Sequence, residues 1–181
     1  MKKISVVYFT ESGAIASLVD SAISEIKSFG CEVFSHAIQG SEIIEGRFSN
    51  TEIFSELETS NAIIFASPTY MGGVAAQFKA FADATSDIWC NQAWSGKLAA
   101  GITCGTAPNG DQSSTLQYLT IFASQHGMLW AGLDSAFGYI DHGVNRFGCQ
   151  LGVVAQVTNN LINEADLKTA QYLGARIVSL L

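Results

Sequence analysis

Three short segments, each directly after an apolar run, carry residue types that bind ligands. The first, at residues 10–15, reads Thr-Glu-Ser-Gly-Ala-Ile and puts Gly13 at the start of a predicted helix. The N–H groups and the dipole of a helix N-terminus attract anions. Because the segment holds no Lys or Arg, it favours a phosphate monoester over a triphosphate with magnesium. A plain helix cap, in which Thr10 or Ser12 accepts a backbone hydrogen bond, is the structural alternative.

The second and third segments suit a flat heterocycle. Residues 67–73 read Ser-Pro-Thr-Tyr-Met-Gly-Gly, and Tyr70 and Met71 either line an aromatic ligand or pack as a lid on the turn. Residues 103–111 read Thr-Cys-Gly-Thr-Ala-Pro-Asn-Gly-Asp, whose backbone donors suit the polar edge of such a ligand. Pro68 and Pro108 are the two prolines of the chain, and rigid turns at strand ends are also a structural device.

Four further residues could carry chemistry. His126 ends a predicted helix, where the dipole favours a cationic imidazole, and we expect a C-terminal capping histidine because the helix carries it away from the three segments. Asp141 and His142 could form an acid–base pair, although adjacent side chains seldom converge. Cys104, with His126 or His142, could serve a thiol hydrolase, but no nucleophile-elbow pattern surrounds it.

Composition narrows the functional classes. The net charge is −7 and the nine basic residues are scattered, which disfavours a nucleic-acid partner. The four cysteines form no CxxC pair and have no His at zinc-ligand spacing, so we expect no metal and reduced thiols in the cytoplasm. No apolar run approaches a membrane span. Charged residues make up only 14% of the chain, which indicates that part of the surface is covered by another subunit. We therefore expect a dimer or tetramer with contacts around Trp89 and residues 134–151.

Apolar runs and helical stripes alternate along the chain. The predicted strands lie at residues 4–9, 31–35, 62–66, 98–104 and 128–133. The predicted helices begin near residues 13, 51, 74, 111 and 163, and the second is capped by Asn50 or Thr51. Strands that are apolar throughout require helices on both faces. We therefore expect a single α/β domain over residues 1–181, a three-layer αβα sandwich with a five-stranded parallel sheet of order 2-1-3-4-5.

This topology places ligands at the carboxyl ends of the strands, beside the switch between the first and third strands. The three segments described above follow the first, third and fourth strands and meet at that edge. We predict one ligand site there. Residues 134–151 form a separate long loop, and loops of that length are usually functional or disordered.

The sequence resembles the flavodoxin-like superfamily and, within it, the WrbA-type NAD(P)H:quinone oxidoreductases. The likeness rests on YFTESGAI after the first strand, SPTYMGGVAAQFKAFADATSDIW, GKLAAGITCG, QHGMLW and NRFGCQLGVVAQ. The sequence departs from the family at Ala107, Pro108 and Asn109, where glycines are common, at Tyr70, where Arg is common, and at Ile15, where simple flavodoxins carry Thr.

The resemblance implies a bound FMN and assigns residues to it. The phosphate would rest on the first segment, at Thr10, Ser12, Gly13, Ala14 and Ile15. The ring system would lie against Pro68, Thr69, Tyr70, Met71 and Gly72. Its other side would meet Thr103, Gly105, Thr106, Asn109, Gly110 and Asp111. As catalytic residues, the resemblance assigns His126 and Trp89 to the flavin pocket, which in such proteins an adjacent subunit can supply.

The function implied is an FMN-dependent oxidoreductase that reduces quinones by two-electron hydride transfer, with NADH or NADPH as co-substrate. The protein orients the flavin and tunes its electronics. The alternative is a flavodoxin-type electron carrier, a monomer without its own substrate turnover. The net charge of −7 fits a carrier with acidic docking residues, whereas the Trp-rich, charge-poor surface does not.

Overall fold

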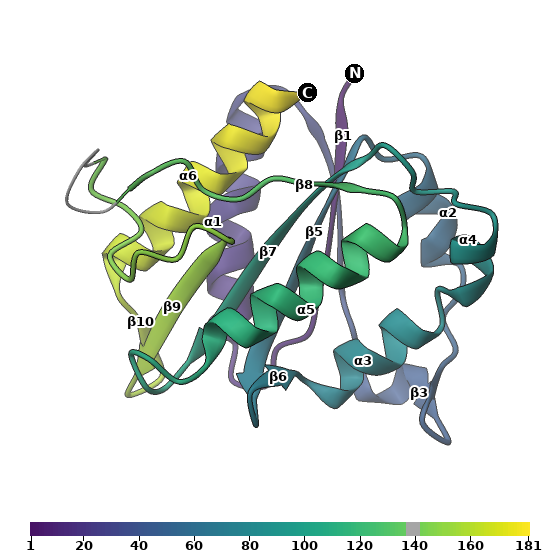
Figure 1. The fold of residues 1–181 in the computed structure, drawn as a ribbon, viewed down its shortest axis with the longest axis horizontal. Helices are drawn as coiled ribbons and strands as arrows, with labels where there is room; N and C mark the ends of the chain where they lie inside the picture. Colours follow the sequence, from purple (N-terminus) through teal and green to yellow (C-terminus); the bar gives the residue numbers. More distant parts are fainter. Residues whose placement is uncertain (137–141) are drawn as a thin grey trace.

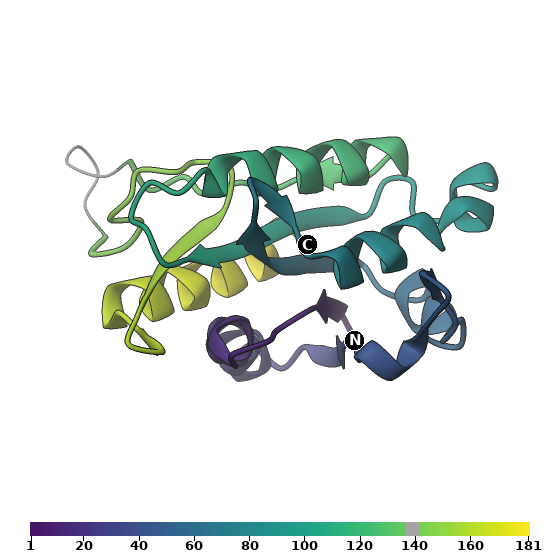
Figure 2. The same ribbon diagram turned by 90° about the horizontal axis from the view of Figure 1, so that it is seen from below.

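The computed structural model describes residues 1–136 and 142–181 and consists of a mostly parallel sheet between two layers of helices (Figures 1 and 2). Five parallel strands form its centre: β1 (Lys3–Tyr8), β2 (Glu32–Ala37), β5 (Ala62–Tyr70), β7 (Leu98–Gly105) and β9 (Val153–Thr158). They lie side by side in the order β2-β1-β5-β7-β9. The predicted order 2-1-3-4-5 is thereby confirmed.

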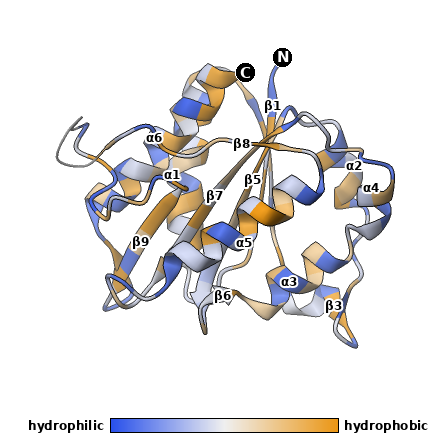
Figure 3. Cartoon of the chain, in the orientation of Figure 1, coloured by the Kyte–Doolittle hydropathy of each residue, from blue (hydrophilic) through white to orange (hydrophobic). Residues whose placement is uncertain are grey.

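Each face of the sheet buries its own apolar core. The helices α1 (Ala14–Ser28) and α6 (Glu164–Leu180) cover one face, where Ile15, Leu18 and Leu173 are fully buried. The helices α3 (Ala76–Asp83) and α5 (Gln112–Gln125) cover the other face with an aromatic-rich core. The central strands β1, β5 and β7 are mostly hydrophobic and buried, as Figure 3 shows, whereas the edge strand β2 has no fully buried residue. Burial on both faces accounts for the continuous apolar runs of the central strands.

The fifth position of the sheet differs from the prediction. Of the predicted strand 128–133, only β8 (Leu129–Trp130) pairs with β7, at the start of that strand. The rest of the position is filled by β9, which pairs with residues 102–105 of β7. Gly152 permits the close approach, because a Cβ there would lie 2.4 Å from the Gly101 carbonyl oxygen. The predicted loop 134–151 therefore lies between β8 and β9, which pair with the start and the end of β7 on the same side.

The third strand runs further than predicted. It passes through Pro68, which lies beside Cys104 of β7, and ends at Tyr70. The Ala66 carbonyl accepts a hydrogen bond from the Phe9 N–H, so the backbone of Pro68, two residues later, points to the side where β1 has already ended. A proline at that place removes no hydrogen bond from the ladder.

Shorter elements complete the chain: η1 (Gly40–Glu42), β3 (Ile43–Ile44), β4 (Arg47–Phe48), α2 (Ile53–Glu58), β6 (Gly73–Val74), α4 (Ser86–Cys90) and β10 (Leu161–Ile162). The predicted helix from residue 74 is divided between β6, α3 and α4. The N-cap of α2 is Glu52, without a side-chain hydrogen bond, so the predicted capping by Asn50 or Thr51 was wrong. Asn163 does cap α6, accepting a hydrogen bond from the Ala165 N–H at 2.9 Å.

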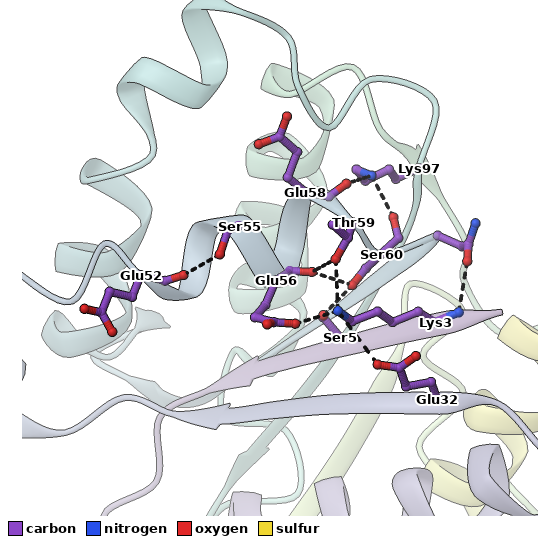
Figure 4. Close-up of polar contacts among 11 residues, drawn as sticks. Lys3, Ser5, Glu32, Glu52, Ser55, Glu56, Glu58, Thr59, Ser60 and Lys97 are labelled. Atoms are coloured by element: carbon purple, nitrogen blue, oxygen red, sulfur yellow. Dashed lines mark hydrogen bonds and ion pairs between the residues drawn. The ribbon is translucent and has the colours of Figure 1, made fainter. Parts of the chain in front are cut away.

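At the amino ends of the strands, polar side chains form hydrogen bonds and ion pairs with neighbouring segments (Figure 4). The Lys3 ammonium contacts Glu56, and the hydroxyls of Ser5 and Ser60 lie 2.6 Å apart. The Lys97 Nζ donates to the carbonyl oxygens of Glu58 and Ser60, at 2.6 and 2.7 Å. The side chains of Lys3, Ser5, Ser60 and Lys97 are thus engaged within the chain.

Among the helices in the described ranges, none is both long and apolar enough to cross a membrane.

Candidate functional site

The first predicted segment forms the start of α1 at the carboxyl end of β1. Gly13 has a φ of 84° and is the N-cap residue, and α1 has no side-chain cap. The Thr10 hydroxyl accepts a hydrogen bond from the Gly13 N–H at 3.1 Å, so it shapes the loop instead of capping the helix. Ser12 is exposed, whereas the side chains of Ala14 and Ile15 are buried. These last two residues can therefore offer a ligand only their backbone N–H groups.

The second segment is a β-hairpin whose tip projects from the sheet. Thr69 pairs with Val74 and Tyr70 with Gly73, which leaves Met71 and Gly72 as a two-residue turn. Both have positive φ values, 49° and 78°, as a type I′ turn requires. Such a φ is uncommon for a residue other than glycine, and the Met71 side chain is 104% exposed.

Tyr70 brings the hairpin toward the first segment. Its side chain is 47% exposed. Partial burial is the largest cause that raises its pKa and the Glu11 carboxylate is the next, so the phenol stays protonated at neutral pH. The influence of Glu11 indicates that the first and second segments adjoin. Two exposed apolar side chains in a polar setting are suited to a flat, partly apolar ligand.

The third segment is organised by Gln112, a residue that sequence reasoning missed. The Gly110 N–H donates to its Oε1 and its Nε2 donates to the Ala107 carbonyl, both at 2.7 Å. The side chain is buried, and a Cβ at Gly105 would lie 2.6 Å from Nε2. Gly105 thus makes room for the amide that holds the loop. The remaining signal in the sequence was a Gln at the first helical position, directly after the small residues.

Beneath the loops, hydroxyl groups connect the strand ends. The Thr69 hydroxyl lies 2.9 Å from that of Thr103 and 2.8 Å from that of Thr115 on α5. Thr103 donates to the Ser67 carbonyl at 2.8 Å, and the Ser67 hydroxyl accepts from the Ala75 N–H at 2.9 Å. Thr103 is fully buried. In this structure it supports the loops from below and does not reach the surface.

The other residues predicted for this edge divide by exposure. Thr106, Asn109, Asp111 and Gly72 are exposed, Gly13, Gly105 and Gly110 are partly exposed, and Pro68 is buried. Asp111 is the N-cap residue of α5, with a φ of 60° and no side-chain cap. Two helices therefore begin uncapped at this edge, α1 and α5. In Figure 1 both starts lie near the β6 hairpin, at the lower edge of the sheet.

His126 and Trp89 come together elsewhere, at the far end of α5. They line a pocket of about 220 Å³ together with Ala82, Asp83, Phe122 and others from α3, α4 and α5. Helix α5 spans 14 residues, or about 21 Å, between this pocket and the third segment. Within one chain, His126 does not reach the loops at the carboxyl edge.

The imidazole of His126 is neutral, contrary to the expected cation. Burial lowers its pKa to about 4, because the ring is 1% exposed between Trp94 and Phe122. Its Nε2 lies 2.9 Å from the Thr85 hydroxyl, which donates its proton to the Ala82 carbonyl at 2.7 Å. Nε2 therefore carries the ring proton, and Nδ1 is a buried acceptor for which the described residues provide no hydrogen-bond partner.

The thiol hydrolase hypothesis fails on Cys104. Burial raises the pKa of this thiol to about 12, and only 3% of the residue is exposed. A neutral, covered thiol is a poor nucleophile. Asp141 lies outside the described residues, and the His142 ring stacks on Tyr172 of α6 with centroids 5.5 Å apart.

Known proteins resemble this chain over nearly its whole length. The NADPH-dependent FMN reductase family matches residues 16–139. The Pseudomonas aeruginosa protein named Flavodoxin FldP is 32% identical, over 98% of this chain and 95% of its own. An Archaeoglobus fulgidus protein named NAD(P)H dehydrogenase (quinone) is 27% identical, over 98% and 96%.

A solved structure gives the same picture. The flavodoxin, WrbA-like protein from Agrobacterium tumefaciens superposes with a TM-score of 0.76 at 33% identity, covering 99% of this chain and 97% of that one. The predicted resemblance is thereby confirmed. The chain belongs to the NADPH-dependent FMN reductase family, as a flavodoxin-like protein of WrbA type.

Proposed function

We propose that this protein is an FMN-dependent NAD(P)H oxidoreductase that reduces quinones. The observation that carries the proposal is the carboxyl edge of the sheet. There the uncapped N-terminus of α1, with the Thr10 and Ser12 hydroxyls, lies beside a hairpin that exposes Tyr70 and Met71. The family to which the chain belongs supports both the cofactor and the nicotinamide donor. The domain would comprise residues 1–181.

The residues at this edge fit FMN. A helix N-terminus without a side-chain cap leaves N–H donors for the phosphate, and no Lys or Arg lies in the segment, as suits a monophosphate. Thr10, Ser12, Gly13, Ala14 and Ile15 would hold that group. The Pro68–Gly72 stretch and the exposed part of the third segment would border the rings.

When bound, FMN would supply the two-electron hydride chemistry that connects the nicotinamide to the quinone. The chain provides the surroundings. Tyr70 and Met71 would cover one face of the ring system and exclude water, because both present apolar surface at the edge. The third segment, held by Gln112, would offer its backbone N–H groups to the polar rim of the rings.

His126 and Trp89 can serve such a site only from a second copy of the chain, since α5 separates them from the edge. We therefore propose a dimer or tetramer in which this pocket meets a neighbour's carboxyl edge. The four free cysteines accord with a cytoplasmic location.

A flavodoxin-type carrier is the second candidate, favoured by the 32% identity to Flavodoxin FldP. A carrier would be a monomer and would pass electrons to a protein partner without oxidising NAD(P)H itself.

The test mixes FMN-loaded protein with NADH or NADPH, with and without benzoquinone, and determines its mass in solution. An oligomer whose nicotinamide oxidation requires quinone is the expected result. A monomer that binds FMN but oxidises neither nicotinamide is the outcome that favours the carrier. As matched variants, Ser12→Ala lies at the phosphate segment, whereas Ser28→Ala lies at the other end of α1 and should leave activity unchanged.

A further inference from the structure

A polar pocket lies at the end of β9, beyond the three loops. Its volume is about 310 Å³, and it opens between the β9–β10 turn and Arg146. Besides Arg146, its lining comprises four neutral polar residues, Gln156, Thr158, Asn159 and Asn163, and two aliphatic ones. The lining thus combines one cation with several hydrogen-bonding groups.

Arg146 is fixed in place by a buried carboxylate. Its Nε and Nη2 donate to the two oxygens of Asp166, at 2.7 and 2.8 Å, and Asp166 is fully buried. The same carboxylate accepts the Gln156 N–H at 3.0 Å. The guanidinium also lies 4.1 Å from the ring centroid of Phe147. This bidentate contact leaves Nη1, the third guanidinium nitrogen, for other acceptors, and the Arg146 side chain remains 30% exposed.

The charge of this pocket is unusual for the chain. The protein carries 16 acidic and nine basic residues, yet among the residues that the structure describes no carboxylate lines the pocket. Arg146 is itself paired with the buried Asp166, so the pocket offers the remaining guanidinium N–H groups as donors and not an uncompensated charge. The lining of the β9 pocket therefore favours an anionic group.

The pocket adjoins the proposed flavin site. Gln156 is paired with Gly105, the last residue of β7, so it lies level with the start of the third loop. Its side-chain Nε2 donates to the Thr106 carbonyl at 3.2 Å. A molecule that reaches the flavin edge could therefore extend over the third loop into the pocket.

We propose that this pocket binds a phosphate group of the nicotinamide dinucleotide, with Arg146 and the amides of Asn159 and Asn163 as donors. The inference rests on the proposed function, because it names where that co-substrate is held. Two phosphates of the dinucleotide share this chemistry, the 2′-phosphate of NADPH and the pyrophosphate of either nucleotide. The choice between them decides whether the enzyme prefers NADPH.

The test measures binding of 2′-AMP, 5′-AMP and adenosine to FMN-loaded protein by calorimetry. The main variant is Asn159→Asp, which adds a carboxylate to the pocket without changing the turn, because Asp tolerates the φ of 52° at this position. The matched control is Asn160→Asp, in the same turn with a φ of 61° and outside the lining. Arg146→Lys retains the charge but loses the two-pronged contact, and thermal unfolding verifies its fold.

We expect a nucleotide to bind more tightly than adenosine, and Asn159→Asp to weaken it roughly tenfold, as for the loss of a charged hydrogen bond. The control should change it less than about threefold. Tighter binding of 2′-AMP assigns the 2′-phosphate, and tighter binding of 5′-AMP assigns the pyrophosphate. Equal affinity for adenosine and both nucleotides, or equal losses in the two Asp variants, would overturn the proposal.

Kinetics separate this inference from the proposed function. In Asn159→Asp, the KM for NADPH should rise with little change in kcat. If the wild type oxidises NADPH and the variant has the same KM, the pocket is wrong and the function stands. If the wild type oxidises neither nicotinamide, the proposed function fails, and with it the assignment of this pocket to a co-substrate.

Discussion

The two ends of the central sheet are built differently. At the amino ends, the charged and hydroxyl groups of Lys3, Ser60 and Lys97 are engaged by neighbouring parts of the chain. At the carboxyl ends, α1 and α5 begin without side-chain caps, and the hairpin tip exposes Tyr70 and Met71. The amino end therefore serves stability, whereas the carboxyl end keeps its donors and apolar surface for a ligand.

The pocket of His126 should show the largest effect on stability. The unfolded chain takes up a proton on this residue near pH 6.5, whereas the folded protein does so only near pH 4. Stability is therefore lost as the pH falls through this window, by about 3 kcal/mol. Denaturant unfolding gives the free energy of unfolding at pH 7 and at pH 4. The difference between the two values should be smaller in His126→Gln than in the wild type. His142→Gln is the control, and an equal pH dependence in the two variants would show that His126 is not the group.

Lys97→Met tests the amino end directly. It removes two hydrogen bonds, from Nζ to the carbonyl oxygens of Glu58 and Ser60. We expect a loss of about 2 kcal/mol in the free energy of unfolding, with FMN affinity unchanged. Lys27→Met, on the last turn of α1, should cost less. A large fall in FMN affinity with Lys97→Met would contradict the division between the two ends.

Ser12→Ala makes the opposite test at the carboxyl end. Loss of the hydroxyl should weaken FMN binding about tenfold, or about 1.4 kcal/mol, and leave the stability of the flavin-free protein within about 0.5 kcal/mol. Titration of FMN fluorescence gives the affinity. If unfolding of the flavin-free protein is strongly affected instead, Ser12 belongs to the structure of the loop.

Met71 gives the smallest and most diagnostic effect. Met71→Asn places a residue suited to positive φ in the turn, and we expect the protein to gain about 0.5–1 kcal/mol of stability. The lost apolar contact should lower kcat/KM for quinone several-fold at the same time. Ile44→Asn, on the exposed β3 strand, is the control for removing an exposed apolar side chain. A variant with unchanged turnover would deny Met71 a role in the site.

Much of the fold could be predicted, because strands buried on both faces are visible as apolar runs. Residues 62–66 and 98–104 illustrate this. The fifth strand was misplaced because two apolar stretches, Met128–Leu133 and Val153–Thr158, compete for one position. The contacts that decide between them are tertiary: the Trp130 indole donates to the Leu151 carbonyl at 2.9 Å, and Gly152 packs against Gly101.

The site was less accessible to sequence reasoning. The uncapped start at Gly13 could be predicted from a glycine after hydroxyl residues. The role of Gln112 could not, because it depends on a side chain folding back on its own loop. Nor could the neutral state of His126, which follows from aromatic rings that α5 and the segment at Trp94 bring around it. The exposure of Met71 could not be predicted either. It depends on a positive φ in the hairpin turn, which is uncommon for a residue other than glycine.

The central claim is that the carboxyl edge holds FMN by its phosphate at the start of α1. It is tested most directly by comparing the affinities of the flavin-free protein for FMN and for riboflavin, which lacks the phosphate. Charged hydrogen bonds to two or more backbone N–H groups predict that FMN binds about a hundredfold more tightly or better. Equal affinities for the two flavins would contradict the account.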